Sequence, residues 1–107
     1  MIRAVYTHGG KVHRLTIEGH SGYAPQGQDI VCAGASMLMF ALAEYLEGFD
    51  GFYCSIQPGN MTVECRSGKH VHTAFEVTAT GFRHLADAYP ENVIFHSPTG
   101  ADSRERP

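Results

Sequence analysis

A cysteine and a histidine, twelve residues apart, are the side chains best suited to chemistry in this sequence. Cys32 becomes a nucleophile when its thiol ionises, and His20 can take up that proton and later return it to a leaving amine. A loop of this length easily brings the end of a strand beside the start of a helix. The pair is a candidate for a thiol hydrolase with Cys32 as nucleophile and His20 as general base. The alternative, from spacing alone, is that Cys32 packs as a small hydrophobic residue.

Two further polar residues accompany the cysteine. Asp29 stands just before apolar helical spacing begins, so it is an expected N-cap, worth about 1 kcal/mol, and Cys32 is then the third helical residue. The free N–H groups and dipole of a helix start favour a thiolate there, whereas the charge of Asp29 opposes a second anion. Ser36 follows one turn after Cys32, where its hydroxyl can support the sulfur or bond back to the Cys32 carbonyl.

The segment between His20 and the helix has the composition of a loop. Residues 19–28 (GHSGYAPQGQ) hold three glycines and a proline and show no hydrophobic periodicity. We expect this loop to act as a lid that admits an extended peptide and then shields the site from water. Its backbone N–H groups, or those at the helix start, are candidates for an oxyanion hole.

Hydrophobic spacing predicts the elements that position these residues. Alternation, interrupted by Gly9-Gly10 and by Pro58-Gly59-Asn60, predicts strands, and steps of three and four predict helices. The expected order is strand 2–7, strand 12–18, helix from 30 to about 47, strand 52–57, strand 61–66, helix 71–89 and a last strand 93–96. This order predicts an α+β fold: a two-layer sandwich whose mostly antiparallel sheet carries both helices on one face. Residues 1–96 form one expected domain, and residues 97–107 an expected disordered tail.

Composition limits the functional class. The chain has 107 residues, 43% of them hydrophobic and 18% charged, with a net charge of −3, which excludes a broad basic surface for nucleic acid. The longest apolar run, residues 30–43, is shorter than the roughly 20 residues that cross a bilayer. Three cysteines and an N-terminus without a signal peptide favour reduced thiols and the cytoplasm.

The other cysteines and histidines have simpler expected roles. Cys54 and Cys65 fall on apolar strand faces and should pack in the core. A zinc site of cysteines and histidines is an alternative, but the sequence has no C-x-x-C pair and no H-x-x-x-H pair with companions, so neither a metal nor a cofactor is expected. His70 and His72 are expected to be exposed at a helix start. The remaining histidines are expected to be structural: His8, His13, His84 and His96.

The same residues carry a resemblance to a known family. A Gly19-His20 pair, a short loop containing Gly27, and the run DIVCAGAS over residues 29–36 resemble the ribosomal-processing cysteine proteases called Prp. Identity and spacing match over about eighteen residues, and chain length and element order are similar. One departure is visible, because Ser21 stands where alanine is usual after the histidine.

The resemblance implies a specific activity. Members cleave an N-terminal extension from a large-subunit ribosomal protein, and are typically homodimers with a flexible loop over the site, here residues 21–28. The family nucleophile and histidine fall on Cys32 and His20, and its aspartate and serine on Asp29 and Ser36. The loop residues expected to contact substrate are Ser21, Gly22, Tyr23 and Gly27.

We therefore expect a cytoplasmic cysteine endopeptidase that acts on a ribosomal protein precursor, without direct nucleic-acid or membrane partners. Two alternatives stay open. One is a non-catalytic ribosome-assembly or peptide-binding module, in which Cys32 would react no faster with iodoacetamide than in the unfolded chain. The other is a hydrolase of thioesters or small amides, which would act on small acyl substrates without an extended peptide.

Overall fold

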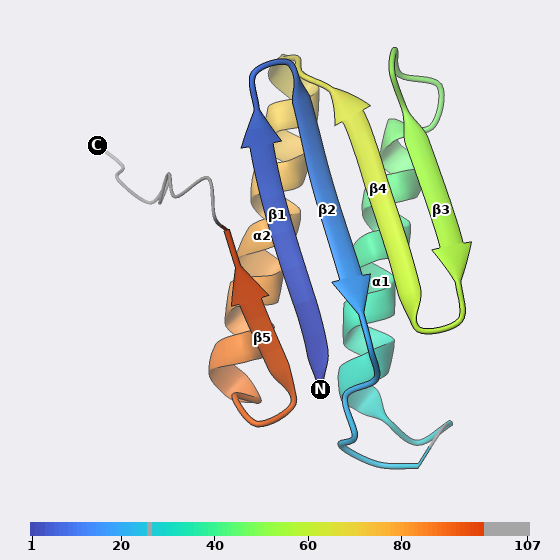
Figure 1. Cartoon of the computed structure of the whole chain (residues 1–107), viewed down its shortest axis with the longest axis vertical. Helices are drawn as coiled ribbons and strands as arrows, with labels where there is room; N and C mark the ends of the chain where they lie inside the picture. Colours follow the sequence, from blue (N-terminus) through green and yellow to red (C-terminus); the bar gives the residue numbers. More distant parts are fainter. Residues whose placement is uncertain (26, 98–107) are drawn as a thin grey trace.

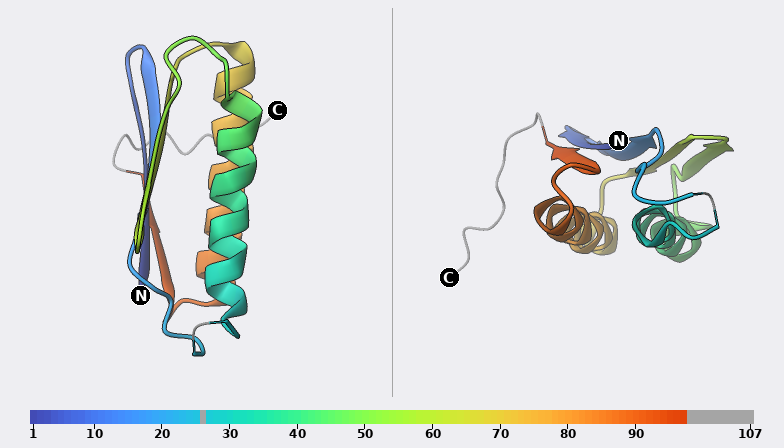
Figure 2. Two further views of the ribbon diagram at one scale, coloured as in Figure 1. Left: turned by 90° about the vertical axis from the view of Figure 1, so that its right-hand side faces the viewer. Right: turned by 90° about the horizontal axis from the view of Figure 1, so that it is seen from below.

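The computed structural model describes residues 1–25 and 27–97. Five strands form one layer and two helices form the other (Figure 1). Their bounds are β1 Ile2–Gly9, β2 Val12–Glu18, α1 Ile30–Leu46, β3 Tyr53–Gln57, β4 Asn60–Arg66, α2 Lys69–Ala88 and β5 Val93–His96. Both helices cover the same face of the sheet (Figure 2), so the predicted α+β sandwich and its element order are confirmed.

The sheet has the strand order β3-β4-β2-β1-β5. The pairs within β3-β4-β2-β1 are antiparallel, because tight turns join β1 to β2 and β3 to β4. Strand β5 pairs in parallel with β1, with Ile2 opposite Val93, because α2 carries the chain across the sheet before β5 begins. The sequence predicted the last strand, but not its parallel partner.

The core follows the predicted periodicities. Alternate residues of β1 and β4 point toward the helices, and Ala4, Val63 and Cys65 are completely buried. From the helices, Val31 and Phe75 fill the space between the layers. The free Cys54 and Cys65 thus occupy the packed positions that their spacing predicted, half-buried and buried respectively.

Two apolar residues on predicted inward faces are open to solvent. Tyr45 is 52% exposed near the C-terminal end of α1, where its ring lies 5.5 Å from that of Phe49. Ile56 is 59% exposed on β3 because it borders an open cavity. Periodicity thus identified the buried face of each element but not these two exposed positions near the ends of α1 and β3.

Neither described helix is long and apolar enough to span a bilayer. Of the predicted disordered tail, residues 98–107 lie outside the described residues.

The fold brings three segments to one end of the sheet. The chain leaves β2, passes through the loop and enters α1 at the lower end of Figure 1, where the turn between β3 and β4 also lies. The predicted nucleophile and base therefore belong to the same end of the molecule.

Candidate active site

An open cavity of about 590 Å³ lies between the start of α1, the loop before it and the β3–β4 turn. His20 and Cys32 both border it. Apolar side chains from the sheet and from α1 form much of the remaining wall: Ile2, Ile17, Phe40, Ile56 and Met61. The cavity combines reactive groups at one end with an apolar floor.

Cys32 lies in the first turn of α1, as the third residue of the helix, and is half-buried. The Ser21 N–H donates a hydrogen bond to its Sγ, with an N···S distance of 3.3 Å. This amide and the positive end of the helix dipole both favour negative charge on the sulfur. The environment of Cys32 therefore suits a thiolate nucleophile.

Asp29 is the N-cap that the sequence predicted. Its Oδ1 accepts hydrogen bonds from the N–H groups of Val31 and Cys32, at 3.0 and 2.9 Å, and its carbonyl accepts one from Ala33. Burial favours the neutral acid, but the Ser21 hydroxyl and the backbone amides outweigh it and lower the pKa of Asp29 to about 2. Three helix-start amides are thus already bonded, which leaves the loop amides as candidates for the oxyanion hole.

Ser21 joins the loop to this cap. It is only 2% exposed, and its hydroxyl donates to Asp29 Oδ2 and accepts from the Tyr23 N–H at 3.1 Å. Its carbonyl accepts a hydrogen bond of 2.9 Å from the side chain of Asn92, in the turn before β5. Every polar group of Ser21 is therefore bonded, so its role here is to position the loop.

Gly19 allows the chain to turn toward the site. It has φ +90, and a Cβ on it would come within 2.4 Å of the Met1 carbonyl oxygen. Its N–H donates to the Gly59 carbonyl at 2.9 Å, and the Met1 backbone nitrogen donates to the His20 carbonyl. A glycine before His20 is therefore a steric requirement of this corner.

The imidazole of His20 rests over the β3–β4 turn. A Cβ on Gly59 would lie 3.2 Å from His20 Nε2, and Gly59 itself has φ +69. Within the described residues, no hydrogen bond joins His20 to Cys32. Such bonds commonly form only when substrate closes the site, so the free geometry does not exclude His20 as the base.

The other predicted site residues differ in position. Ser36 borders the cavity one turn after Cys32, and its hydroxyl has no hydrogen-bond partner in the part of the chain that is described. Gly22 and Gly27 also border the cavity. Tyr23 is instead exposed and packs edge-on against Tyr89, at 5.4 Å between ring centres.

Sequence reasoning missed two residues that shape the site. Gly59 was read only as part of a turn, and Asn92 was not considered. The sequence around Gly59 and Asn92 gives little indication of this role, because each contacts the site only where segments far apart in sequence come together. Of the two, only Gly59 carried a signal, because a glycine in a turn often marks a place where another group comes close, here His20.

The chain is similar to known cysteine proteases. Residues 1–94 match the family described as cysteine protease Prp. The ribosomal processing cysteine protease Prp of Mycoplasma pneumoniae is 32% identical over 101 residues, which cover 89% of this chain and 93% of that protein.

Solved structures share the fold. The crystal structure of an essential ribosomal processing protease Prp from S. aureus, in complex with a covalently linked product peptide, has a TM-score of 0.76 at 23% identity. The match covers 91% of this chain and 99% of that one. The SMU.848 protein of Streptococcus mutans has a TM-score of 0.72 at 28% identity, with coverage of 91% and 93%.

Proposed function

This chain belongs to the Prp family of cysteine proteases, and from this premise we propose that it removes the N-terminal extension of a large-subunit ribosomal protein precursor. Cys32 is the nucleophile and His20 the general base. One observation carries the assignment: Cys32 Sγ lies at a helix start, accepts the Ser21 N–H, and borders the same cavity as His20.

The reaction follows the ordinary course of thiol proteolysis. His20 takes the proton of the Cys32 thiol, and Sγ attacks the scissile carbonyl carbon. The C–N bond then breaks, His20 returns the proton to the leaving amine, and the acyl group stays on Sγ as a thioester. Water, deprotonated by His20, hydrolyses that thioester and releases the thiol.

Asp29 and Ser21 act as positioning residues in this scheme. The ionised Asp29 carboxylate fixes the first turn of α1 and, through the Ser21 hydroxyl, the amide that contacts Sγ. Ser36 lines the groove beside the nucleophile.

The cavity supports a peptide substrate with apolar side chains. Phe40 and Ile56 are both more than two-fifths exposed on its rim, and Met61 forms part of its floor. An extended segment lying between α1 and the β3–β4 turn would cover these side chains and pass beside Cys32. The S. aureus protease that shares this fold was solved in complex with a covalently linked product peptide.

We further propose that the chain works in the cytoplasm as a homodimer. One face of α1 exposes Ile30 and Met37, at 59% and 67%. These residues recur at helical spacing, and a second copy packed on this face would remove them from water. The three free cysteines suit a reducing compartment.

Incubation with the ribosomal precursor of the same organism tests the function. The wild type should shorten the precursor at one peptide bond, as measured by mass spectrometry. Cys32→Ala should lower the rate by about 10³-fold or more, because it removes the nucleophile. Cys54→Ala, which removes a thiol from outside the cavity, is the matched control. Cleavage by Cys32→Ala at the wild-type rate would refute the assignment, and binding of the precursor without any cleavage by the wild type would indicate a peptide-binding module.

A further inference from the structure

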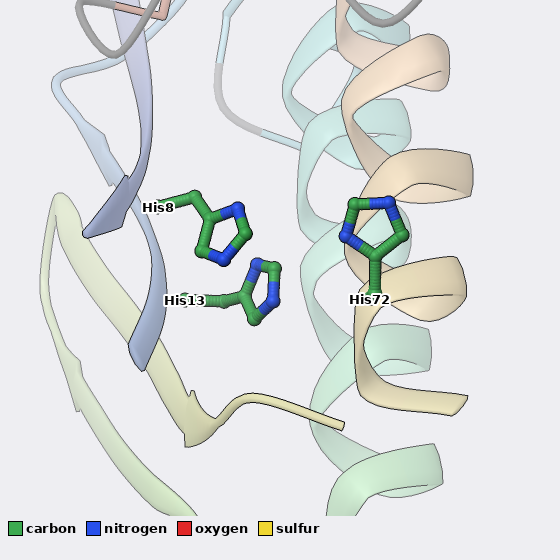
Figure 3. A group of neighbouring side chains, drawn as sticks. All are labelled: His8, His13 and His72. Atoms are coloured by element: carbon green, nitrogen blue, oxygen red, sulfur yellow. The ribbon is translucent and has the colours of Figure 1, made fainter. Parts of the chain in front are cut away.

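Three histidines meet at the end of the sheet opposite the cavity. His8 of β1 and His13 of β2 are directly paired across the hairpin, and His72 lies in the first turn of α2 (Figure 3). The ring centres of His8 and His13 are 3.8 Å apart, and that of His72 is 5.8 and 5.5 Å from theirs. Separated by up to 64 positions in the chain, they form no recognisable sequence motif.

The spacing of the three rings suits a metal ion. One nitrogen from each lies within 4.8 Å of the other two. A tetrahedral zinc ion, with Zn–N bonds of about 2.0–2.1 Å, needs its nitrogens about 3.4 Å apart. To shorten the nitrogen–nitrogen distances from up to 4.8 Å to that value, the rings must move by about 1.4 Å. His72 is exposed and His8 half-buried, so rotation of these two side chains can supply it while the buried His13 stays in place.

The surroundings of His13 hold it in a ligand-competent form. Tyr6 Oη lies 2.8 Å from His13 Nδ1, and Tyr6 is also hydrogen-bonded to the side chain of Glu76. When the Tyr6 hydroxyl donates to the side chain of Glu76, its oxygen accepts the Nδ1–H of His13. The ring lone pair is then on Nε2, which accepts a hydrogen bond of 3.2 Å from the Ser67 hydroxyl. A metal ion would take the place of that proton.

This chain of contacts has the form of the outer shell of a metal site. Metal-binding histidines usually donate their second ring N–H to a carboxylate, a carbonyl or water, which fixes the tautomer and the ring orientation.

We propose that His8, His13 and His72 bind one divalent transition-metal ion of the zinc type and thereby fasten the β1–β2 hairpin to the start of α2. Ser67 or water supplies the fourth ligand. Three imidazole nitrogens suit Zn²⁺, Co²⁺, Ni²⁺ or Cu²⁺ rather than Ca²⁺ or Mg²⁺, which prefer oxygen. His13 and His20 are seven positions apart along β2 and its extension, roughly 20 Å, so the ion takes no part in proteolysis.

Metal titration of the full chain tests the proposal. The background is Cys32→Ala, because a thiolate near an imidazole can itself bind zinc. One Co²⁺ per chain should give visible d–d absorption, and Zn²⁺ at about 100-fold above its Kd should raise Tm by roughly 10 °C. His72→Gln should weaken binding at least tenfold and, at the same Zn²⁺ concentration, reduce this rise in Tm to about half or less. Because His72 is exposed, the substitution should leave the metal-free Tm unchanged.

His70→Gln is the matched control, since His70 is an exposed histidine in the same helical turn but outside the cluster. It should bind Co²⁺ and Zn²⁺ like the background protein. Tyr6→Phe keeps the ring and removes only the hydroxyl, so binding should weaken about tenfold through loss of the outer contact. The absence of a metal-induced Tm rise in the background protein, or an equal rise in His72→Gln, would overturn the proposal.

Discussion

At the scale of single residues, the site depends on how Asp29 distributes its hydrogen bonds. One carboxylate oxygen holds the helix start and the other holds the Ser21 hydroxyl, whose backbone N–H reaches Cys32 Sγ. The Asp29 carboxylate therefore accepts hydrogen bonds from several donors that lie close to the sulfur.

Ser21→Ala tests this network through pH. The folded-state pKa of Asp29, about 2, lies below its ordinary value of 3.8, so Asp29 stabilises the fold fully above about pH 4 and loses that contribution as pH falls through 2. Without the Ser21 hydroxyl, the pKa of Asp29 should rise and acid unfolding should begin at a higher pH. Carboxyl NMR titration and urea unfolding between about pH 2 and pH 7 measure both effects. An Asp29 that titrates near 3.8 in the wild type would contradict the network.

The residue scale was partly predictable. The N-cap role of Asp29 and the helical position of Cys32 follow from local spacing, because a cap and its helix are neighbours in sequence. The burial of Ser21 does not, because it depends on where the loop packs and on the distant Asn92. Ser21 is hydrogen-bonded to the protein around it and is not among the residues that line the cavity, and its expected contact with substrate stays a prediction.

At the scale of elements, a turn positions the proposed base. Gly59 leaves room for the His20 ring at the end of β2, and its carbonyl accepts the Gly19 N–H. The β3–β4 hairpin therefore acts as a platform for the imidazole, although it contributes no reactive group itself.

Gly59→Ala should lower kcat/KM by roughly tenfold or more, because the added methyl displaces the His20 ring and small misplacements of catalytic groups are costly. Gly10→Ala is the matched control. Gly10 has φ +61 in the β1–β2 turn, with no atom within 4 Å of an added Cβ. Both variants should lose about 1–2 kcal/mol of stability through backbone strain. Equal kcat/KM in the two variants would show that Gly59 has no positioning role.

The elements themselves were well predicted, because alternation and helical spacing are local. The turn at Pro58-Gly59 was recognised from composition, but its contact with His20 arises from the pairing of β4 with β2, which places Asn60 opposite Glu18. Parallel pairing of β5 was not foreseen for the same reason, since strand order is set by packing of the whole sheet.

At the scale of the whole molecule, the two ends of one sheet carry different chemistry. The cavity lies where β2 meets α1, and the histidine cluster lies where the β1–β2 hairpin meets α2 (Figures 1 and 3). The cluster could not be read from sequence, because its members come from three elements that only the fold brings together. The exposed face of α1 adds a third surface, proposed above for a second copy.

Met37→Glu tests that surface. A charge at its centre should convert a dimer into a monomer of 11.7 kDa, as measured by light scattering during size-exclusion chromatography. Val77→Glu on α2 is the matched control, since Val77 is 66% exposed and Met37 67%. A wild-type chain that elutes as a monomer, or a Val77→Glu variant that dissociates equally, would contradict the proposed interface.

The most direct test of the account is the rate at which iodoacetamide modifies each cysteine, followed by peptide mapping. Cys32 should react many times faster in the folded protein than in the unfolded chain, and His20→Ala should slow it, while the folded Cys54 and Cys65 react slowly as internal references. Such a result would show a sulfur activated by its helix start and its imidazole. Modification of Cys32 in the folded protein no faster than in the unfolded chain would contradict the central claim.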